Sequence, residues 1–593
     1  MSVRKFLRLA LAAAVFLASY AYLSRTGFVY VVSKGRQWRS WKYVPSSFDW
    51  GKRPEAHPVG EDMMVRLPEG NPLRLPRVQH EFSADELSRA HNETQRARRD
   101  AVRRAARRSW RAYRKHAWGR DELAPQSLAG RDTFAGWGAT LVDSLDTLWI
   151  LGMEEEFRDA VAHVATIDWN KATTGDCSLF ETNIRYLGGL LSAYDLSREQ
   201  VLLDKAVELG DMLYAAFDTP NRMPANRLRF DLAREGRLTA SNREASAAVG
   251  SLSLEFTRLS QLTGDPKYYR AVDGIKRHLE RTQDSTSLPG MWPVFVDLEN
   301  GFLTPDTAYS LGAWADSAYE YLSKMHALLG GLDPTYGKLH AKAMATVERH
   351  VLFRPMLPDP APDVLFPGTV LSNGRIVELS PEIQHLACFA GGMFALGGRL
   401  FRNEAHVGVG ERLARGCVWA YGAFPTGIMP EKAELVPCAE GDEAGGRDRL
   451  APCAWNETRW RERARGRRGG ELPPRGFAAV IDPQYQLRPE AIESVFVLYR
   501  VTGKADLLDA AWRMFEAVTS ATRTRLAYSA IGDVRAAGET SKLDSMESFW
   551  IAETLKYFYL IFSEPDLISL DDYVFNTEAH PFRRPKPDGD GGE

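Results

Sequence analysis

The chain has 593 residues, and its hydrophobic content of 44% is enough for a large core. Length alone would allow about four domains. The formal net charge of −2 argues against general binding of nucleic acid, which needs a strongly basic surface.

The N-terminus has the pattern of a membrane anchor. Arg4 and Lys5 precede an apolar run over residues 6–23, which is close to the minimum length of a membrane helix. The basic flank places the rest of the chain on the lumenal or outer side. A cleaved signal peptide is the alternative, but no clear small-residue cleavage site follows the run. We therefore expect a signal anchor over residues 1–23.

Residues 24–88 are rich in proline and aromatic residues without a period, and we interpret them as a stem that partly packs on the following domain. Residues 89–118 are strongly basic, and Val102, Ala106, Trp110 and Tyr113 recur there at helical spacing. This pattern favours an amphipathic helix with a solvated arginine face. A helix that binds nucleic acid or an anionic membrane is the alternative.

Helical patterns then alternate with loops rich in glycine and proline up to about residue 562. About fourteen helices in succession suggest helical hairpins around a common centre, and the absence of a short repeat argues against a regular solenoid. Residues 438–475 differ in composition and indicate a flexible surface insertion. Examples of the expected helices are 184–194, 202–217, 245–262, 268–282, 313–329, 336–352, 386–401, 490–502, 507–522 and 546–562.

Five cysteines leave at least one without a partner in the chain. An oxidising lumen permits disulfides, and proximity along the chain favours Cys388 with Cys417 and Cys438 with Cys453. Cys177 is then left over, either free or linked to a partner. Sequons for N-glycosylation begin at residues 92 and 456 and are consistent with a lumenal position.

The most informative motif lies at residues 488–494. Pro489 suits the first position of a helix, and the spacing of Glu490 and Glu493 places both carboxylates on one helical face. A strongly apolar stretch follows them, so the acids stand at the mouth of a buried helix and need a partner, a metal or a catalytic role. Stabilisation of a helix N-terminus by negative charge is the simpler reading for one glutamate alone.

Similar acids in apolar surroundings recur along the chain. Glu181 lies four residues before Arg185 and could be only its ion-pair partner, while Asp143 and Asp146 could cap a core helix. Paired carboxylates are typical of glycoside hydrolysis, in which one protonates the leaving oxygen and one activates water. Hard oxygen ligands without a Cys/His cluster favour Ca²⁺ over Zn²⁺. Further acids of this kind are Asp316, Glu553 and Glu578.

Together these segments resemble glycoside hydrolase family 47, the class I α-1,2-mannosidases, with fungal-type members as the expected subgroup. The matching stretches are residues 138–149, 180–195, 488–494, 546–557 and 573–581, in the order that the family has them. The resemblance covers roughly residues 90–582.

The resemblance implies an all-α fold, an (αα)7 barrel over residues 89–582 with a C-terminal hairpin plugging one end, followed by a disordered tail at 583–593. It implies inverting hydrolysis of terminal α-1,2-linked mannose from high-mannose N-glycans, with Ca²⁺ as cofactor. With the anchor, it implies a single-pass type II protein of the endoplasmic reticulum or Golgi membrane, with a monomeric catalytic domain in the lumen.

The resemblance implies a role for individual residues of this chain. Glu490 matches the base that activates water, and Glu181 and Asp316 match two acids, either of which could donate the proton. Thr577 matches the direct calcium ligand. The remaining matches are carboxylates that hold the calcium-bound waters (Glu493, Glu553 and Glu578), substrate contacts (Arg185, Arg488, Phe549 and His385) and the family's disulfide (Cys388 and Cys417). His385 could instead be a core histidine.

Two residues depart from the family pattern. Trp314 stands two residues before the aspartate, where members with strict single-mannose specificity carry arginine, and Gln384 stands where many relatives have aspartate. Neither departure falls at the position of a catalytic acid. The alternative function is a glycan-binding quality-control factor on the same fold with weak or no turnover, with which Asn183 is compatible. A helical scaffold with incidental acids does not explain the co-occurring motifs.

Overall fold

A computed structural model describes residues 29–34, 37–90, 93–301, 306–439, 449–465 and 472–588. The apolar run expected to be the anchor lies outside these residues, as do 440–448 and 466–471 of the expected insertion and residues 589–593 of the tail. Within the described ranges no helix is both long and apolar enough to cross a membrane.

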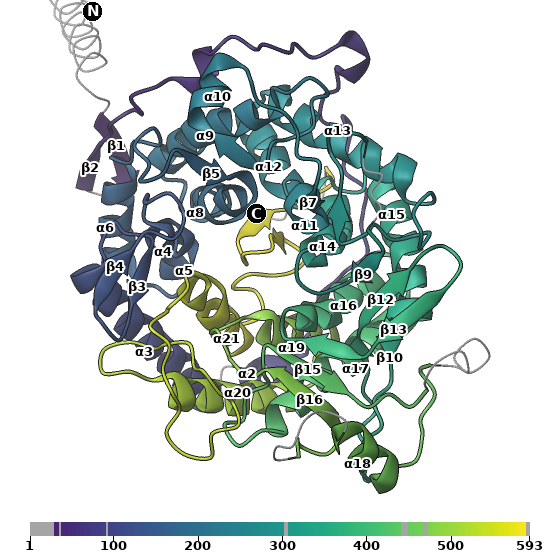
Figure 1. Cartoon of the computed structure of the whole chain (residues 1–593). Coiled ribbons are helices and arrows are strands. Elements are labelled where there is room, and N and C mark those ends of the chain that lie inside the picture. The colour runs from purple at the N-terminus through teal and green to yellow at the C-terminus, as the bar shows by residue number, and fades with distance from the viewer. Residues whose placement is uncertain are drawn as a thin grey trace, which may run out of the picture.

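The helices form a ring around a common centre (Figure 1), and the first long helix, α3 (Glu93–His116), packs against the last, α21 (Leu555–Ile561). The other principal helices are α4 (Ala139–Asp143), α5 (Leu145–Ile150), α6 (Glu154–Val164), α8 (Gly188–Ser197), α9 (Gln200–Tyr214), α11 (Ser246–Gly250), α12 (Ser253–Thr263), α13 (Pro266–Thr282), α14 (Asp316–Leu328), α15 (Pro334–Thr346), α16 (Ala390–Leu400), α17 (Glu404–Gly422), α19 (Glu490–Thr502) and α20 (Asp506–Thr522). Shorter helices are α2 (Ala84–Ala90), α7 (Leu179–Glu181), α10 (Phe230–Glu235) and α18 (Glu457–Arg465).

Most helices expected from the apolar periodicity are confirmed, although several are divided. The helix expected over 490–502 is α19, which begins at Glu490 directly after Pro489 and ends at Thr502. Gly503 follows it with a positive φ of 70°, which suits glycine. The helix expected over 184–194 begins as the π-helix η3 (Thr182–Leu187), and that over 546–562 contains the π-helix η8 (Trp550–Thr554). π-Helical turns are frequent at functional sites.

Short antiparallel strands connect the helices, and their two to six residues are too few for a clear alternating pattern. The pairs are β1 (Val29–Lys34) with β2 (Gln37–Lys42), β3 (Glu122–Ala124) with β4 (Ala129–Arg131), β5 (Asp176–Ser178) with β6 (Arg227–Arg229), β7 (Glu244–Ala245) with β8 (Phe295–Val296), β10 (Leu352–Phe353) with β11 (Phe366–Pro367), and β17 (Tyr573–Phe575) with β18 (Pro581–Arg583). Two sheets have three strands, in the orders β13 (Val377–Ser380), β12 (Thr369–Ser372), β9 (Ala308–Ser310) and β14 (Glu382–Gln384), β15 (Lys432–Leu435), β16 (Phe477–Asp482).

The C-terminal pair β17–β18 lies in the middle of the ring (Figure 1). The turn between its strands is held by Asn576, whose side chain donates to the carbonyl of Ile184 at 3.0 Å and accepts from the backbone N–H of His580 at 2.8 Å. His580 is fully buried and bonds Asp143 and Asp146. These contacts fix the turn against the inner helices.

Part of the stem segment packs on the outside of the ring. The buried Lys205 on α9 donates to the carbonyl of Val44 at 2.6 Å, Trp50 is buried, and Arg53 pairs with Asp218 at 2.6 Å. The contacts run over helix α9 and the loop after it, so residues 43–53 are part of the folded unit.

The arginine-rich helix α3 is amphipathic, as predicted, with Val102, Trp110 and Tyr113 buried. Several of its arginines pair with acids of other elements, among them Arg98 with Asp509 at 2.7 Å and Arg114 with Asp159 at 2.5 Å. These ion pairs tie the arginine-rich side of α3 to neighbouring elements.

Two disulfides form, Cys388–Cys417 and Cys438–Cys453, as sequence proximity favoured, while Cys177 is free and buried. Burial raises the pKa of the Cys177 thiol to about 12, which keeps it protonated and unreactive. The segment expected to be a flexible insertion contains helix α18, which packs on β16 through the buried Trp460.

Candidate active site

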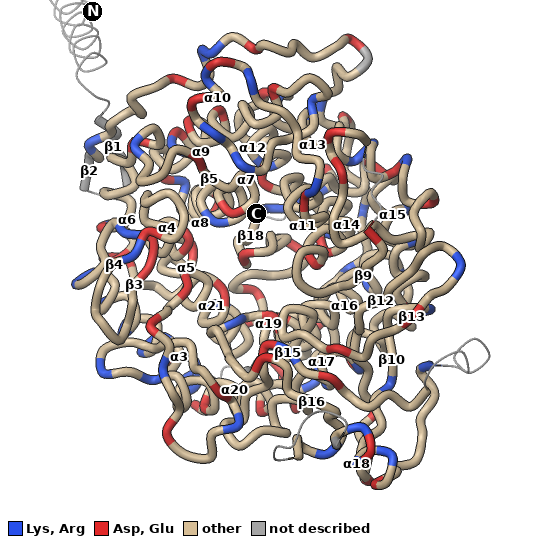
Figure 2. Tube along the Cα trace, in the orientation of Figure 1, with Lys and Arg blue, Asp and Glu red and all other residues tan. Residues whose placement is uncertain are grey.

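A cavity of about 440 Å³ brings together ten of the eleven residues that the sequence assigned to catalysis, substrate and metal. Figure 2 shows acidic residues around the centre of the ring, where this cavity lies. Eight carboxylates line the cavity with only two cationic side chains, which are those of Arg185 and Arg488. The carboxylates are Glu181, Glu244, Asp316, Glu320, Glu490, Glu493, Glu553 and Glu578.

Separate elements deliver these groups. Helix α7 ends with Glu181, α14 begins with Asp316, α19 begins with Glu490, and the turn between β17 and β18 carries Thr577. Three of these positions lie at helix ends that face the cavity. Unsatisfied backbone N–H groups at a helix start favour a carboxylate there, so the helix-dipole reading and the catalytic reading of Glu490 agree.

Glu490 is held as an ionised carboxylate. Burial alone would raise its pKa, but the hydrogen bond from His385 and the charge of Arg488 outweigh burial and lower the pKa below the ordinary value. His385 Nδ1 lies 2.8 Å from Glu490 Oε2, and its Nε2 lies 2.8 Å from the Tyr421 hydroxyl. An ionised carboxylate only accepts, so Nδ1 carries the proton.

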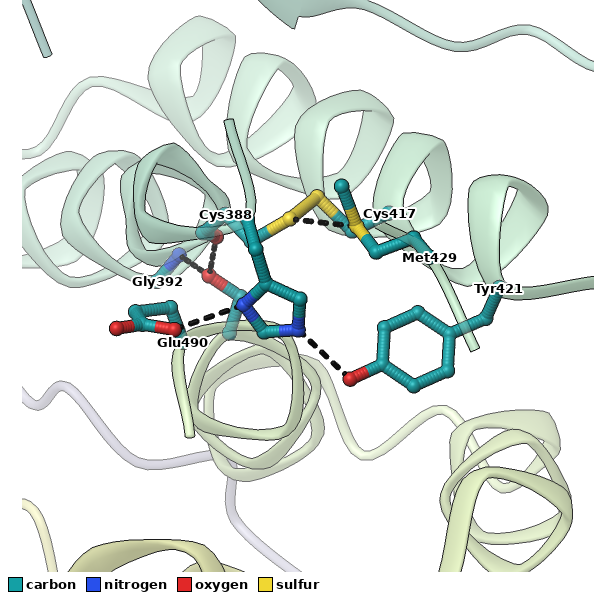
Figure 3. The surroundings of a disulfide bond; sticks show 8 residues. Cys388, Gly392, Cys417, Tyr421, Met429 and Glu490 are labelled. Carbon is teal, nitrogen blue, oxygen red and sulfur yellow. Dashed lines mark hydrogen bonds and ion pairs between the residues drawn. A yellow bond between two sulfur atoms is a disulfide. The ribbon is translucent and has the colours of Figure 1, made fainter. Parts of the chain in front are cut away.

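His385 is the one predicted substrate contact that does not line the cavity. It is fully buried and contacts both Glu490 and Tyr421. Figure 3 shows Glu490 and Tyr421 near the Cys388–Cys417 disulfide. The core-histidine alternative therefore fits its position, in direct contact with Glu490.

The environment of Asp316 favours its protonated form, in contrast to that of Glu490. Burial raises its pKa to about 7, and the neighbouring charges of Glu320 and Glu490 add to this, against the hydrogen bond from the Ser317 backbone at 2.8 Å. At neutral pH a large share of Asp316 is therefore protonated while Glu490 is ionised. Two carboxylates with separated pKa values are the pattern of an acid and a base.

Glu181 is tied to the cationic side of the cavity. Arg185 Nε donates to its Oε2 at 2.9 Å, and Arg185 Nη1 donates to Glu578 at 2.9 Å. The guanidinium carbons of Arg185 and Arg488 lie 5.8 and 5.9 Å from the ring centre of Phe549. The two cations and the aromatic ring therefore lie close together in the cavity lining.

Around Thr577 the carboxylates repel one another. Burial and the charges of neighbouring glutamates raise the pKa of Glu493 and of Glu553 well above the ordinary value, and burial raises that of Glu578 to about 8. Lys324 pairs with Glu320 and lies 3.9 Å from Glu493, so one lysine serves two of these carboxyl groups. A bound divalent cation would remove this repulsion.

The donor chemistry here fits calcium better than a softer metal, because all the facing groups are oxygens. Across the described ranges no three His, Cys, Asp or Glu side chains converge closely enough to hold a metal directly. The Thr577 backbone N–H donates to the Tyr321 hydroxyl at 3.2 Å.

Two cavity carboxylates were absent from the sequence prediction. Glu320 lies four residues after Asp316 on α14, so the same-face spacing that paired Glu490 with Glu493 would have indicated it. Glu244 lies in the two-residue strand β7 and has no such signal. Outside the cavity lining, Glu431 accepts from Arg488 Nε at 2.5 Å and fixes that guanidinium.

A barrel of helices with paired carboxylates of separated pKa in its centre defines a glycoside hydrolase. The model of "Glycosyl hydrolase family 47" matches residues 105–584. The chain therefore belongs to glycosyl hydrolase family 47, as the sequence motifs indicated.

The names of similar proteins agree with this family assignment. The chain is 35% identical over 532 residues to "Mannosyl-oligosaccharide alpha-1,2-mannosidase" of Coccidioides posadasii, covering 86% of this chain and 95% of the relative. It is 37% identical over 478 residues to the human "Endoplasmic reticulum mannosyl-oligosaccharide 1,2-alpha-mannosidase", covering 80% of this chain and 62% of the relative. The solved structure of "alpha-1,2-mannosidase from Trichoderma reesei" matches with a TM-score of 0.72 and 33% identity, over 82% of this chain and 99% of that one.

Proposed function

We propose that this protein removes terminal α-1,2-linked mannose from high-mannose N-glycans, with inversion and with Ca²⁺ as cofactor. The single observation that carries the proposal is the cavity in which an ionised Glu490 and a partly protonated Asp316 lie among substrate-binding cations. Membership of family 47 and the printed names of the relatives support the substrate.

In the proposed reaction Glu490 takes a proton from water as that water attacks the anomeric carbon. An acid on the opposite side of the sugar donates a proton to the leaving oxygen. We assign this proton to Asp316, because its pKa of about 7 leaves the proton in place at neutral pH. Glu181 stays paired with Arg185, and in our assignment it orders the leaving-group side.

The remaining groups hold the sugar. The ring of Phe549 would pack against the apolar face of the terminal mannose, while Arg185 and Arg488 donate to its hydroxyls. Thr577 would bind calcium directly, with Glu320, Glu493, Glu553 and Glu578 holding the waters around it. A bound ion would coordinate the oxygen atoms of sugar hydroxyls and offset the negative charge of the carboxylates.

Trp314 supports broad rather than strict trimming. Its side chain is 63% exposed at the cavity, its φ is 75°, and its ring lies 6.1 Å from that of Phe295. Gln384 accepts from the Ala313 backbone N–H at 2.9 Å and so holds the loop that presents Trp314. An indole stacks on many sugar faces, whereas arginine at this place would select one branch by directed hydrogen bonds.

A digestion experiment tests the function. The protein is incubated with a high-mannose N-glycan of nine mannoses in calcium buffer, and the isomers are identified over time. Release of mannose that a chelator blocks supports the proposal, and progression to five mannoses supports broad trimming. One stable eight-mannose isomer would contradict broad trimming, and no release from any α-1,2-linked mannoside would contradict the function itself.

The alternative function, a glycan-binding quality-control factor, gains no support from the position of Asn183. Asn183 is fully buried, donates to Glu255 at 2.8 Å and does not line the cavity. All three acid positions, by contrast, face the cavity. Stable capture of misfolded glycoproteins without trimming would favour that alternative.

We further propose the seven-hairpin (αα)7 arrangement, with β17–β18 as the plug at one end of the barrel, and a monomeric catalytic domain. We also retain the type II topology in the endoplasmic reticulum or Golgi membrane with residues 1–23 as anchor. Protection of the domain from protease in sealed microsomes, lost on addition of detergent, tests the topology.

A further inference from the structure

A second cavity, of about 200 Å³, lies between α13, the end of α9 and the stem segment. It shares no lining residue with the active-site cavity. In Figure 1, α13 lies at the outer edge of the ring, away from the β17–β18 hairpin in the centre. The cavity is large enough for several waters or for an oxyanion, since one water occupies about 30 Å³ in the liquid.

Four guanidinium groups line this cavity, together with the single carboxylate of Asp273. Arg270, Arg277 and Arg281 are spaced seven and four residues apart on α13, so they lie along one face of the helix. Arg222 enters from the loop after α9. Four like charges around one small volume are unfavourable unless anions compensate them.

Two of the four cations are compensated within the protein. Arg222 pairs with Glu55 at 3.4 Å and with Asp218 at 3.5 Å. Arg277 Nε lies 2.9 Å from Asp273. These two arginines form a fixed part of the wall.

Arg270 and Arg281 have no carboxylate partner among the residues that the structure describes. Arg270 Nε is buried there without a hydrogen-bond partner, a state that costs free energy. Arg281 Nη2 contacts the ring nitrogens of His278 at 2.8 and 3.1 Å. Burial, and then the charge of Arg281, lower the pKa of His278. The neutral imidazole therefore does not compensate the positive charge of Arg281.

We propose that this cavity binds a phosphate group, either as inorganic phosphate or as the phosphomonoester of a small molecule. The planar fork of a guanidinium matches two phosphate oxygens, and phosphate would supply the acceptor that Arg270 Nε lacks. The lining also contains the apolar side chains of Val59, Met63, Phe217 and Met223. These side chains suit the body of an ester.

Calorimetry at constant ionic strength tests the site, with inorganic phosphate, a hexose 6-phosphate and the unphosphorylated hexose as separate probes. We expect saturable binding with a Kd of about 1 mM or tighter. Arg270→Gln and Arg281→Gln should each raise the Kd about tenfold or more, while Arg111→Gln, at an exposed arginine on α3, should not change it. Arg270→Lys keeps the charge without the fork and should restore only part of the affinity.

The probes separate the two sources of phosphate. Tighter binding of the ester than of inorganic phosphate, with none of the free hexose, assigns an ester ligand, and equal binding assigns the inorganic ion. Absence of saturable phosphate binding, or an unchanged Kd in folded Arg270→Gln protein, would overturn the proposal. Mannose release by the same variants should equal that of the parent, so a failure of the proposed glycosidase function would be seen independently.

Discussion

Removing the imidazole behind the base tests whether His385 sets the protonation of Glu490. The hydrogen bond from Nδ1 to Glu490 is 2.8 Å long and buried. A hydrogen bond to a charged group contributes about 1.5–3 kcal/mol, and one pKa unit corresponds to about 1.4 kcal/mol. His385→Leu should therefore raise the pKa of Glu490 by about 1–2 units, because the lost donor stabilises only the ionised form.

The readout is the pH dependence of kcat/KM for mannose release, whose acid limb reports the base in the free enzyme. The limb should move upward by about 1–2 pH units in His385→Leu, with less than about tenfold loss near pH 7, where the base is still ionised. Tyr421→Phe removes only the partner of Nε2 and should move the limb much less. His340→Leu, at a buried histidine outside the cavity, is the matched control. A uniform loss of rate with an unmoved limb would refute the role assigned to His385.

Three further outcomes follow from the same structure. Glu490→Gln should keep the fold and the stabilisation by calcium but lose about 100-fold or more in kcat; a near-normal rate in the digestion assay would remove the base assignment. Thr577→Val, which removes the hydroxyl and keeps the backbone carbonyl, should require more calcium for activity than the parent in a calcium titration, and equal requirements would show that the Thr577 hydroxyl is not a ligand. Burial lowers the pKa of His340 from 6.5 to about 3, so the unfolded chain binds more protons below about pH 6.5 and stability falls as the pH falls. Relative to His340→Leu, the parent should lose about 2 kcal/mol between pH 7 and 5 in denaturant titrations, and parallel losses would contradict this.

The sequence by itself determined the helical architecture and most of the residues at the site. The apolar periodicity predicted α19 to the residue, and the three-residue spacing placed Glu490 and Glu493 on one face. These features are local, because helix formation and same-face spacing depend on residues within a few turns. Long motifs in order identified the family, which then assigned distant residues such as Thr577.

Only the tertiary structure determined which carboxyl groups are protonated and which residues each charged side chain contacts. Asp316 and Glu490 are both acids before apolar helices, yet burial raises the pKa of one while His385 and Arg488 lower that of the other. Likewise no local pattern shows that Arg270 would line a cavity with its Nε buried and without a hydrogen-bond partner. The chain specifies which groups are present, but the charge state of each depends on burial and on neighbours that only folding brings within a few ångströms.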